Sequence, residues 1–131
     1  MANKECILQL LDLYFSKYDF RMSREDNNSE YNTSFNVEYA INEHDSSIIK
    51  VTIDTSISNS TNSISLTLQT IAIFKIEKND IEEASYEQIM KQNTVAIIFP
   101  FIRSQISLLT TQPGMPPIIL PPMNIAALLN S

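Results

Sequence analysis

The sequence predicts an α+β fold in which antiparallel strands come first and helices follow. Three observations support this prediction. Residues 49–68 alternate apolar and polar side chains around a polar turn, residues 94–111 have helical spacing, and residues 113–123 are apolar but hold five prolines. At 131 residues the chain is long enough to bury a sizeable core. We expect residues 1–131 to form a single domain.

The clearest elements are the two strands of a hairpin. Apolar residues occupy every second position in residues 49–57, with Thr55 as the exception, and again in 64–68, a period typical of strands with one solvated face. The polar residues 59–63 between them predict the turn. Residues 35–41 alternate in the same way and lead into a polar turn at 42–47. Together these segments predict an antiparallel meander.

The second strand of the hairpin changes character beyond Leu68. Ile71 and Ile73 fall on the face that had been polar, while Ala72 and Phe74 continue the apolar face. Because both faces are apolar there, we expect something to cover the outer one.

Residues 7–22 fit two descriptions. The apolar residues from 11 to 15 are at odd positions and those from 18 to 22 are at even positions. This change predicts a long strand with a bulge near Ser16-Lys17. Residues 4–15 also fit a helical period. We favour a strand from Leu13 onward, leave residues 1–12 open, and expect a polar loop over residues 23–33.

Helices are predicted in the second half of the chain. Residues 80–92 begin with acidic side chains, which the helix macrodipole favours at an N-terminus. Residues 94–111 form a second helical run that Pro100 should bend or start. Its apolar face consists of Ile98, Ile102, Ile106 and Leu109. A short terminal helix is predicted over 124–130, with Asn124 as its N-cap.

The composition limits the classes of function. The formal net charge of −6 argues against a nucleic-acid partner. No basic and then apolar signal segment opens the sequence, and no run reaches the roughly 18 apolar residues of a membrane span. We therefore expect a cytoplasmic protein that does not insert into membranes.

Residues suited to catalysis or metal binding are few. The single histidine, His44, lies in a polar turn, and the single cysteine, Cys6, is far from it in sequence. One glycine cannot make a phosphate-binding loop. The pair Glu82-Glu83 is best explained as a solvated helix start. We expect no enzyme activity, no metal site and no cofactor.

The proline-rich segment 113–123 is the main candidate for a binding site. Proline fixes φ and removes a backbone donor, so the segment cannot join a helix or a sheet, yet its apolar side chains need cover from water. The segment is either sealed against its own domain or held open as one side of an apolar groove. The predicted peptide-binding residues of such a groove are Ile71, Ile73, Met115, Ile118, Ile119, Leu120 and Met123.

Several motifs in this region resemble the SecB family of protein-export chaperones. They are Phe99-Pro100-Phe101, Arg103, Ile106, Pro116, Leu120, Pro122, Asn124, Ala127 and Leu128, with a weaker match at Ile73-Phe74-Lys75-Ile76. The resemblance implies a four-stranded antiparallel sheet with a long helix and a short C-terminal helix on one face. It also implies an ATP-independent chaperone that holds unfolded preproteins and passes them to the SecA motor.

The resemblance further implies a homotetramer built as a dimer of dimers, and the amount of apolar surface agrees with an oligomer. The residues expected at the oligomer interface are Leu66, Leu68, Thr70, Ile102 and Ile106. One departure from the family pattern concerns SecA. The family docks the zinc-bearing tail of the motor on acidic and apolar residues, where this chain has Ser65 and Thr67. We therefore expect hand-over to SecA to be weak or missing.

Three hypotheses follow for the function. The first is a general holdase for unfolded, export-competent preproteins. The second is a dedicated SecB-like chaperone or interaction module that guards one partner, such as an antitoxin. The third is that the proline-rich segment is sealed against its own domain and binds nothing.

Overall fold

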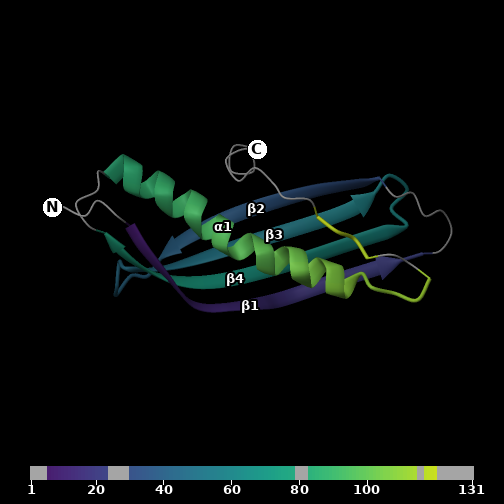
Figure 1. Cartoon of the computed structure of the whole chain (residues 1–131), viewed down its shortest axis with the longest axis horizontal. Coiled ribbons are helices and arrows are strands. Elements are labelled where there is room, and N and C mark those ends of the chain that lie inside the picture. Colours follow the sequence, from purple (N-terminus) through teal and green to yellow (C-terminus); the bar gives the residue numbers. More distant parts are fainter. Residues whose placement is uncertain (1–5, 24–29, 79–82, 115–116, 121–131) are drawn as a thin grey trace.

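Four strands precede one helix in the computed structural model, which describes residues 6–23, 30–78, 83–114 and 117–120 (Figure 1). The elements are β1 (Cys6–Met22), β2 (Tyr31–Ile41), β3 (Ile48–Asn59), β4 (Ile64–Lys78) and α1 (Glu83–Leu109). All pairs in the sheet are antiparallel, in the order β1-β4-β3-β2. The predicted α+β class and four-stranded antiparallel sheet are therefore confirmed. The short helix predicted over 124–130 lies outside the described residues.

The β3–β4 hairpin lies where it was predicted, but its turn is residues 60–63, one residue shorter than the predicted 59–63. The buried Asn59 side chain closes this turn, since its Oδ1 accepts the Ile64 N–H at 3.1 Å and its Nδ2 donates to Ser63 Oγ at 2.7 Å. Asn62 has a φ of 56°, a left-handed conformation that asparagine tolerates better than most residues. The polar turn thus satisfies backbone groups that the ladder leaves unpaired.

Strand β1 is one continuous strand of 17 residues, so the helical alternative for residues 4–15 is wrong for the described part. It pairs with β4 along its whole length, and its register shifts once between Leu10 and Asp12 and again between Phe15 and Lys17. The second shift is the predicted bulge, whereas the first was missed. Because of the two bulges, apolar residues at even positions, such as Leu10, and at odd positions, such as Phe15, lie on one face of the sheet.

Helix α1 is a single helix of 27 residues that continues through Pro100, not two successive helical segments as predicted. An interior proline costs about 3 kcal/mol because it removes one hydrogen bond and crowds the preceding turn. Burial of one large aliphatic side chain is worth about 1.5–3 kcal/mol. The helix buries Val95, Ile98, Ile102 and Ile106 almost completely, so packing outweighs the cost of the proline.

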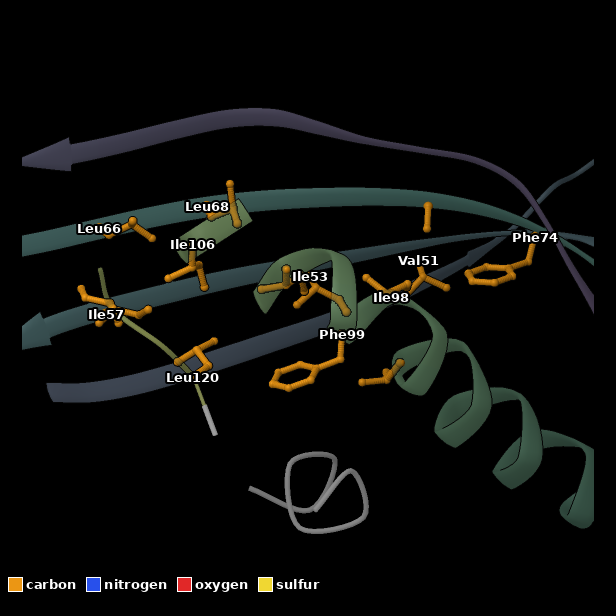
Figure 2. Packing of buried hydrophobic residues seen from close by; sticks show 14 of the residues in the cluster. Val51, Ile53, Ile57, Leu66, Leu68, Phe74, Ile98, Phe99, Ile106 and Leu120 are labelled. Carbon is orange, nitrogen blue, oxygen red and sulfur yellow. The ribbon is translucent and has the colours of Figure 1, made fainter. Parts of the chain in front are cut away.

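The core lies between α1 and one face of the sheet (Figures 1 and 2). Every second residue of β3 and β4 points into it. Figure 2 shows Ile98, Phe99 and Ile106 of the helix among sheet residues that include Val51, Ile53, Leu66 and Phe74. We call this covered side the inner face of the sheet and the opposite side the outer face.

This packing disagrees with the prediction of which residues form the oligomer interface. The five residues expected there are all 2% exposed or less in the single chain: Leu66, Leu68, Thr70, Ile102 and Ile106. The helix and the sheet of the same chain cover one another here, so these residues offer no surface to a second subunit. The apolar alternation of β4 was recognised correctly, but it marks the interior of the single chain.

Helix α1 also contacts the edge strand β2. The rings of Phe35 and Phe99 meet edge to face, with centroids 5.8 Å apart. The hydroxyl of Tyr39 donates to the carbonyl of Lys91 at 3.1 Å. Burial raises the pKa of the Tyr39 hydroxyl above its usual value, so the hydroxyl stays protonated well beyond neutral pH.

Replacing a core residue of the helix should destabilise the fold far more than replacing an exposed one. Ile102→Ala should lower the free energy of unfolding by roughly 2–4 kcal/mol, because it leaves a cavity between the helix and the sheet. Leu108→Ala, at a position that is 69% exposed, should change it by less than about 1 kcal/mol. Denaturant unfolding followed by circular dichroism measures both. Equal effects would contradict the assignment of the core.

Candidate functional site

Residues 117–120 lie against the C-terminal half of α1, held by hydrogen bonds to Arg103 and Ser107 of the helix and to Thr110, which follows its last residue. The Ile118 N–H donates to Thr110 Oγ1 at 2.8 Å, and Ser107 Oγ donates to the Ile118 carbonyl at 3.2 Å. Arg103 Nε donates to the Leu120 carbonyl at 3.0 Å. Proline-rich segments cannot pair with a sheet, and here polar side chains of a helix take the place of strand partners.

The side chains of this segment alternate between the core and the solvent. Ile118 and Leu120 are each 5% exposed and belong to the core cluster, where Figure 2 shows Leu120 near Phe99 and Ile57. Ile119, between them, is 71% exposed. The hypothesis of a sealed segment is therefore right for Ile118 and Leu120, while Ile119 remains available to a ligand.

An open groove of about 610 Å³ runs between the helix and this segment, on the side of α1 that faces away from the sheet. Its lining residues come from successive turns of the helix and from the returning segment: Pro100, Arg103, Ser104, Ser107, Leu108, Thr111, Ile119 and Leu120. Helical positions three and four apart share one side of a helix, which explains the spacing of the first six. We call this site the α1 groove.

The chemistry of the α1 groove is mixed. Leu108 is 69% exposed and Ile119 is 71% exposed, so two large aliphatic side chains are offered to the solvent. Arg103 is the one charged residue in the lining, and Ser104, Ser107 and Thr111 contribute hydroxyl groups. A site with apolar contacts and scattered polar groups suits a segment of polypeptide, which presents apolar side chains beside backbone donors and acceptors.

The predicted groove residues do not come together. Ile71 lies opposite Tyr14 and Thr52 in the ladder, on the outer face of the sheet. Its neighbours Thr70 and Ala72 point into the core beneath α1. Ile71 and Ile73 are therefore on the far side of the sheet from residues 117–120, and the prediction of one groove that includes both is wrong.

The other predicted peptide-binding residues have different outcomes. Met115 and Met123 lie outside the described residues. Of the remaining three, only Ile119 is exposed in the α1 groove, whereas Ile118 and Leu120 anchor the segment in the core. Sequence reasoning missed the helical side of the groove, although Leu108 lies off the apolar stripe of residues 98, 102 and 106 and could have indicated a second surface.

The outer face of the sheet combines two apolar residues, Ile71 and Ile73, with a row of polar side chains. Ile71 is 8% exposed because neighbouring side chains of its own face cover it, and Ile73 is partly exposed. A polar row crosses the sheet beside them, in which Ser16 Oγ donates to Gln69 Oε1 and Gln69 Nε2 donates to Asp54 Oδ1 at 2.9 Å. This face is largely hydrophilic.

The described residues lack the features of a metal site and of a membrane-spanning helix. No group of three or more His, Cys, Asp or Glu side chains is close enough to hold a metal ion there. His44 is exposed in the turn after β2, where its N–H donates to Asn42 Oδ1 at 2.8 Å. Within the same described segments, no helix has the length and apolar character needed to span a membrane.

Residues 11–131 match the family described as preprotein translocase subunit SecB. The chain belongs to the SecB family. An uncharacterized protein of Methanocaldococcus jannaschii is 25% identical over 135 residues, which cover 98% of this chain and 86% of that protein. The resemblance inferred from the proline-rich motifs is thereby confirmed.

Solved structures share the fold of this SecB-family chain. A SecB-like chaperone of Mycobacterium tuberculosis, in complex with a ChAD peptide from the HigA1 antitoxin, superposes with a TM-score of 0.71 and 17% identity, covering 89% of this chain and 90% of that one. A protein of unknown function from Streptococcus agalactiae gives a TM-score of 0.54 at 12% identity, covering 92% and 99%. At these identities the likeness establishes the fold.

The contact between Thr110 and Ile118 should be needed to hold the returning segment. Thr110→Val keeps the shape of the side chain but removes the acceptor of a buried N–H, which should cost about 1–3 kcal/mol of unfolding free energy. It should also speed hydrogen exchange at the Ile118 amide. Thr111→Val is the control, because that exposed hydroxyl donates to the Ser107 carbonyl and not to the returning segment. Unchanged exchange at Ile118 in Thr110→Val would contradict the docking described above.

Proposed function

We propose that this SecB-family protein is a nucleotide-independent chaperone that holds unfolded, export-competent polypeptides through the α1 groove. One observation carries the proposal: two large aliphatic side chains, Leu108 and Ile119, stand exposed in an open groove beside hydroxyl groups and a cation. The groove is solvent-accessible while the core beneath it is closed. A client can therefore bind without any opening of the fold.

The expected strength of such a contact follows from its area. At about 25 cal/mol per Å², burial of roughly 200 Å² of apolar surface contributes about 5 kcal/mol before ordering costs are subtracted. One groove alone would therefore bind weakly. Several grooves in one assembly, acting on one long client, would raise the apparent affinity by orders of magnitude. Weak individual contacts also keep the binding indifferent to sequence.

A second candidate is a dedicated chaperone for one partner, such as an antitoxin. The Mycobacterium tuberculosis structure favours it, since a SecB-like chaperone with this fold was solved with an antitoxin peptide. Co-purification from the native cell separates the two candidates. Many secretory precursors would support the general holdase, and one stoichiometric partner would support the dedicated chaperone.

We also propose a cytoplasmic homotetramer without catalytic activity, on the basis of family membership. The five buried residues first expected at the interface cannot supply it. Exposed apolar residues of the described chain remain available, among them Tyr14 and Tyr18 on β1. Sedimentation at micromolar concentration should give the mass of a tetramer, and a monomeric mass would refute this part of the proposal.

Client holding should depend on the two exposed aliphatic residues of the groove. Leu108→Ser and Ile119→Ser, singly and together, should progressively reduce the suppression of aggregation of an unfolded model client. Both positions are exposed, so the free energy of unfolding should change by less than about 1 kcal/mol for each. Ile41→Ser, which removes an aliphatic side chain that is 59% exposed at the end of β2, is the matched control. Equal activity of all variants would argue against the groove.

Hand-over to SecA should be weak. Ser65 and Thr67 lie on the outer face of the sheet and offer hydroxyls where the family pattern has acidic and apolar residues. Loss of one close charge pair can cost more than tenfold in affinity. Calorimetric titration with the zinc-bearing tail peptide of SecA should give no low-micromolar binding at physiological salt. Tight binding under those conditions would mean that another surface docks the motor.

A further inference from the structure

Two threonine hydroxyls are buried in the core without a hydrogen-bond partner among the described residues. Thr55 on β3 and Thr70 on β4 are 1% and 0% exposed, and the Oγ1 atom of each is unsatisfied there. The buried hydroxyls of Thr94 and Thr110 differ, since each donates to a carbonyl of α1 at 2.7 Å. A strand in the middle of a sheet offers no such carbonyl, because its backbone groups are used in the ladder.

The two unsatisfied hydroxyls lie close together beneath the middle of the helix. Thr70 is opposite Ile53 in the ladder, and Thr55 is two residues further along β3, so the threonines are diagonal neighbours on the inner face of the sheet. Figure 2 shows Ile53 between Ile98 and Ile106 of the helix. We call Thr55 and Thr70 the polar spot of the core, and it faces the part of α1 between these two isoleucines.

The same part of the helix contains Pro100. Because proline has no N–H, the carbonyl of Ala96 lacks the donor that an α-helix normally supplies four residues later. The helix continues through this position because Ile98 and Ile102 pack against the sheet. The hydrogen bonding of the helix and the packing beneath it are therefore both weakened at one place.

An unsatisfied buried hydroxyl favours any state in which water reaches it. Its burial costs free energy that hydration would restore. Valine has nearly the same shape and no hydroxyl, so a core with valine at both positions would avoid this cost. Proteins open locally where their contacts are least stable, at free energies below that of global unfolding.

We propose that α1 opens locally from the sheet over Thr55 and Thr70, with Pro100 as the hinge, while the rest of the fold stays closed. The opening hydrates both hydroxyls of the polar spot and exposes the apolar inner face around them. The inference concerns the motion of the single chain and does not rest on the proposed function.

Native-state hydrogen exchange on the full-length protein measures this opening. The amide of Ile102, in the turn after Pro100, should exchange roughly tenfold faster or more than the amide of Val51 in the central strand β3. Its rate should also respond little to low concentrations of denaturant, because a local opening exposes little surface. Equal rates and equal responses to denaturant at the two amides would overturn the inference.

Valine variants show whether the two hydroxyls are responsible. Thr55→Val and Thr70→Val should each slow exchange at the Ile102 and Val51 amides alike, by roughly tenfold, because neither opened state then gains from hydration of a hydroxyl. Thr67→Val removes an exposed hydroxyl from the outer face of β4 and should change neither rate. If only the Val51 amide slows, the local opening does not hydrate the threonines, and the inference is wrong. It is equally wrong if neither amide slows.

Replacement of the proline tests the hinge. Pro100→Ala restores an N–H that can donate to the Ala96 carbonyl, so exchange at Ile102 should slow by roughly tenfold or more relative to exchange at Val51. Pro113→Ala removes a proline beyond the end of α1 and should leave the ratio of the two rates unchanged. An unchanged ratio in Pro100→Ala would overturn the assignment of the hinge and with it the inference.

Discussion

Burial of one helical stripe against the inner face of the sheet is the interaction on which the rest of the structure depends. A four-stranded sheet with one apolar face needs a cover, and a helix of 27 residues that contains a proline needs packing to remain continuous. Each element meets the requirement of the other. The fully buried Phe74 and Ile98 mark the contact, which leaves the opposite side of the helix free.

The flank of the helix beside the buried stripe then determines how the proline-rich segment is held. Arg103, Ser107 and Thr110 lie three or four residues apart, so they line up along the helix and meet the backbone of residues 118–120 in order. This contact sends two side chains of the segment into the core and leaves Ile119 in solvent. The groove is the space that remains between this segment and the next turns of the helix.

The same contact separates the residues that stabilise the fold from those of the proposed binding site. The residues that close the core are nearly inaccessible, and those that offer apolar surface to a ligand contribute little to it. A chaperone with this division can expose aliphatic side chains without weakening its own fold. Its acidic composition favours solubility at the same time, because net charge opposes self-association.

The sequence by itself determined the α+β class, the β3–β4 hairpin with its turn, the bulge at residue 16 and the family. These depend on local patterns: a period of two or 3.6, polar turn residues and the spacing of prolines. Only the tertiary structure decided which face of the sheet the helix covers, that the proline-rich segment joins that same side, and that Leu66 and Ile102 are interior. Periodicity shows that a face is apolar, but the partner that buries it comes from a distant part of the chain. The α1 groove could not be read from the sequence for the same reason, since it exists only after two segments have packed together.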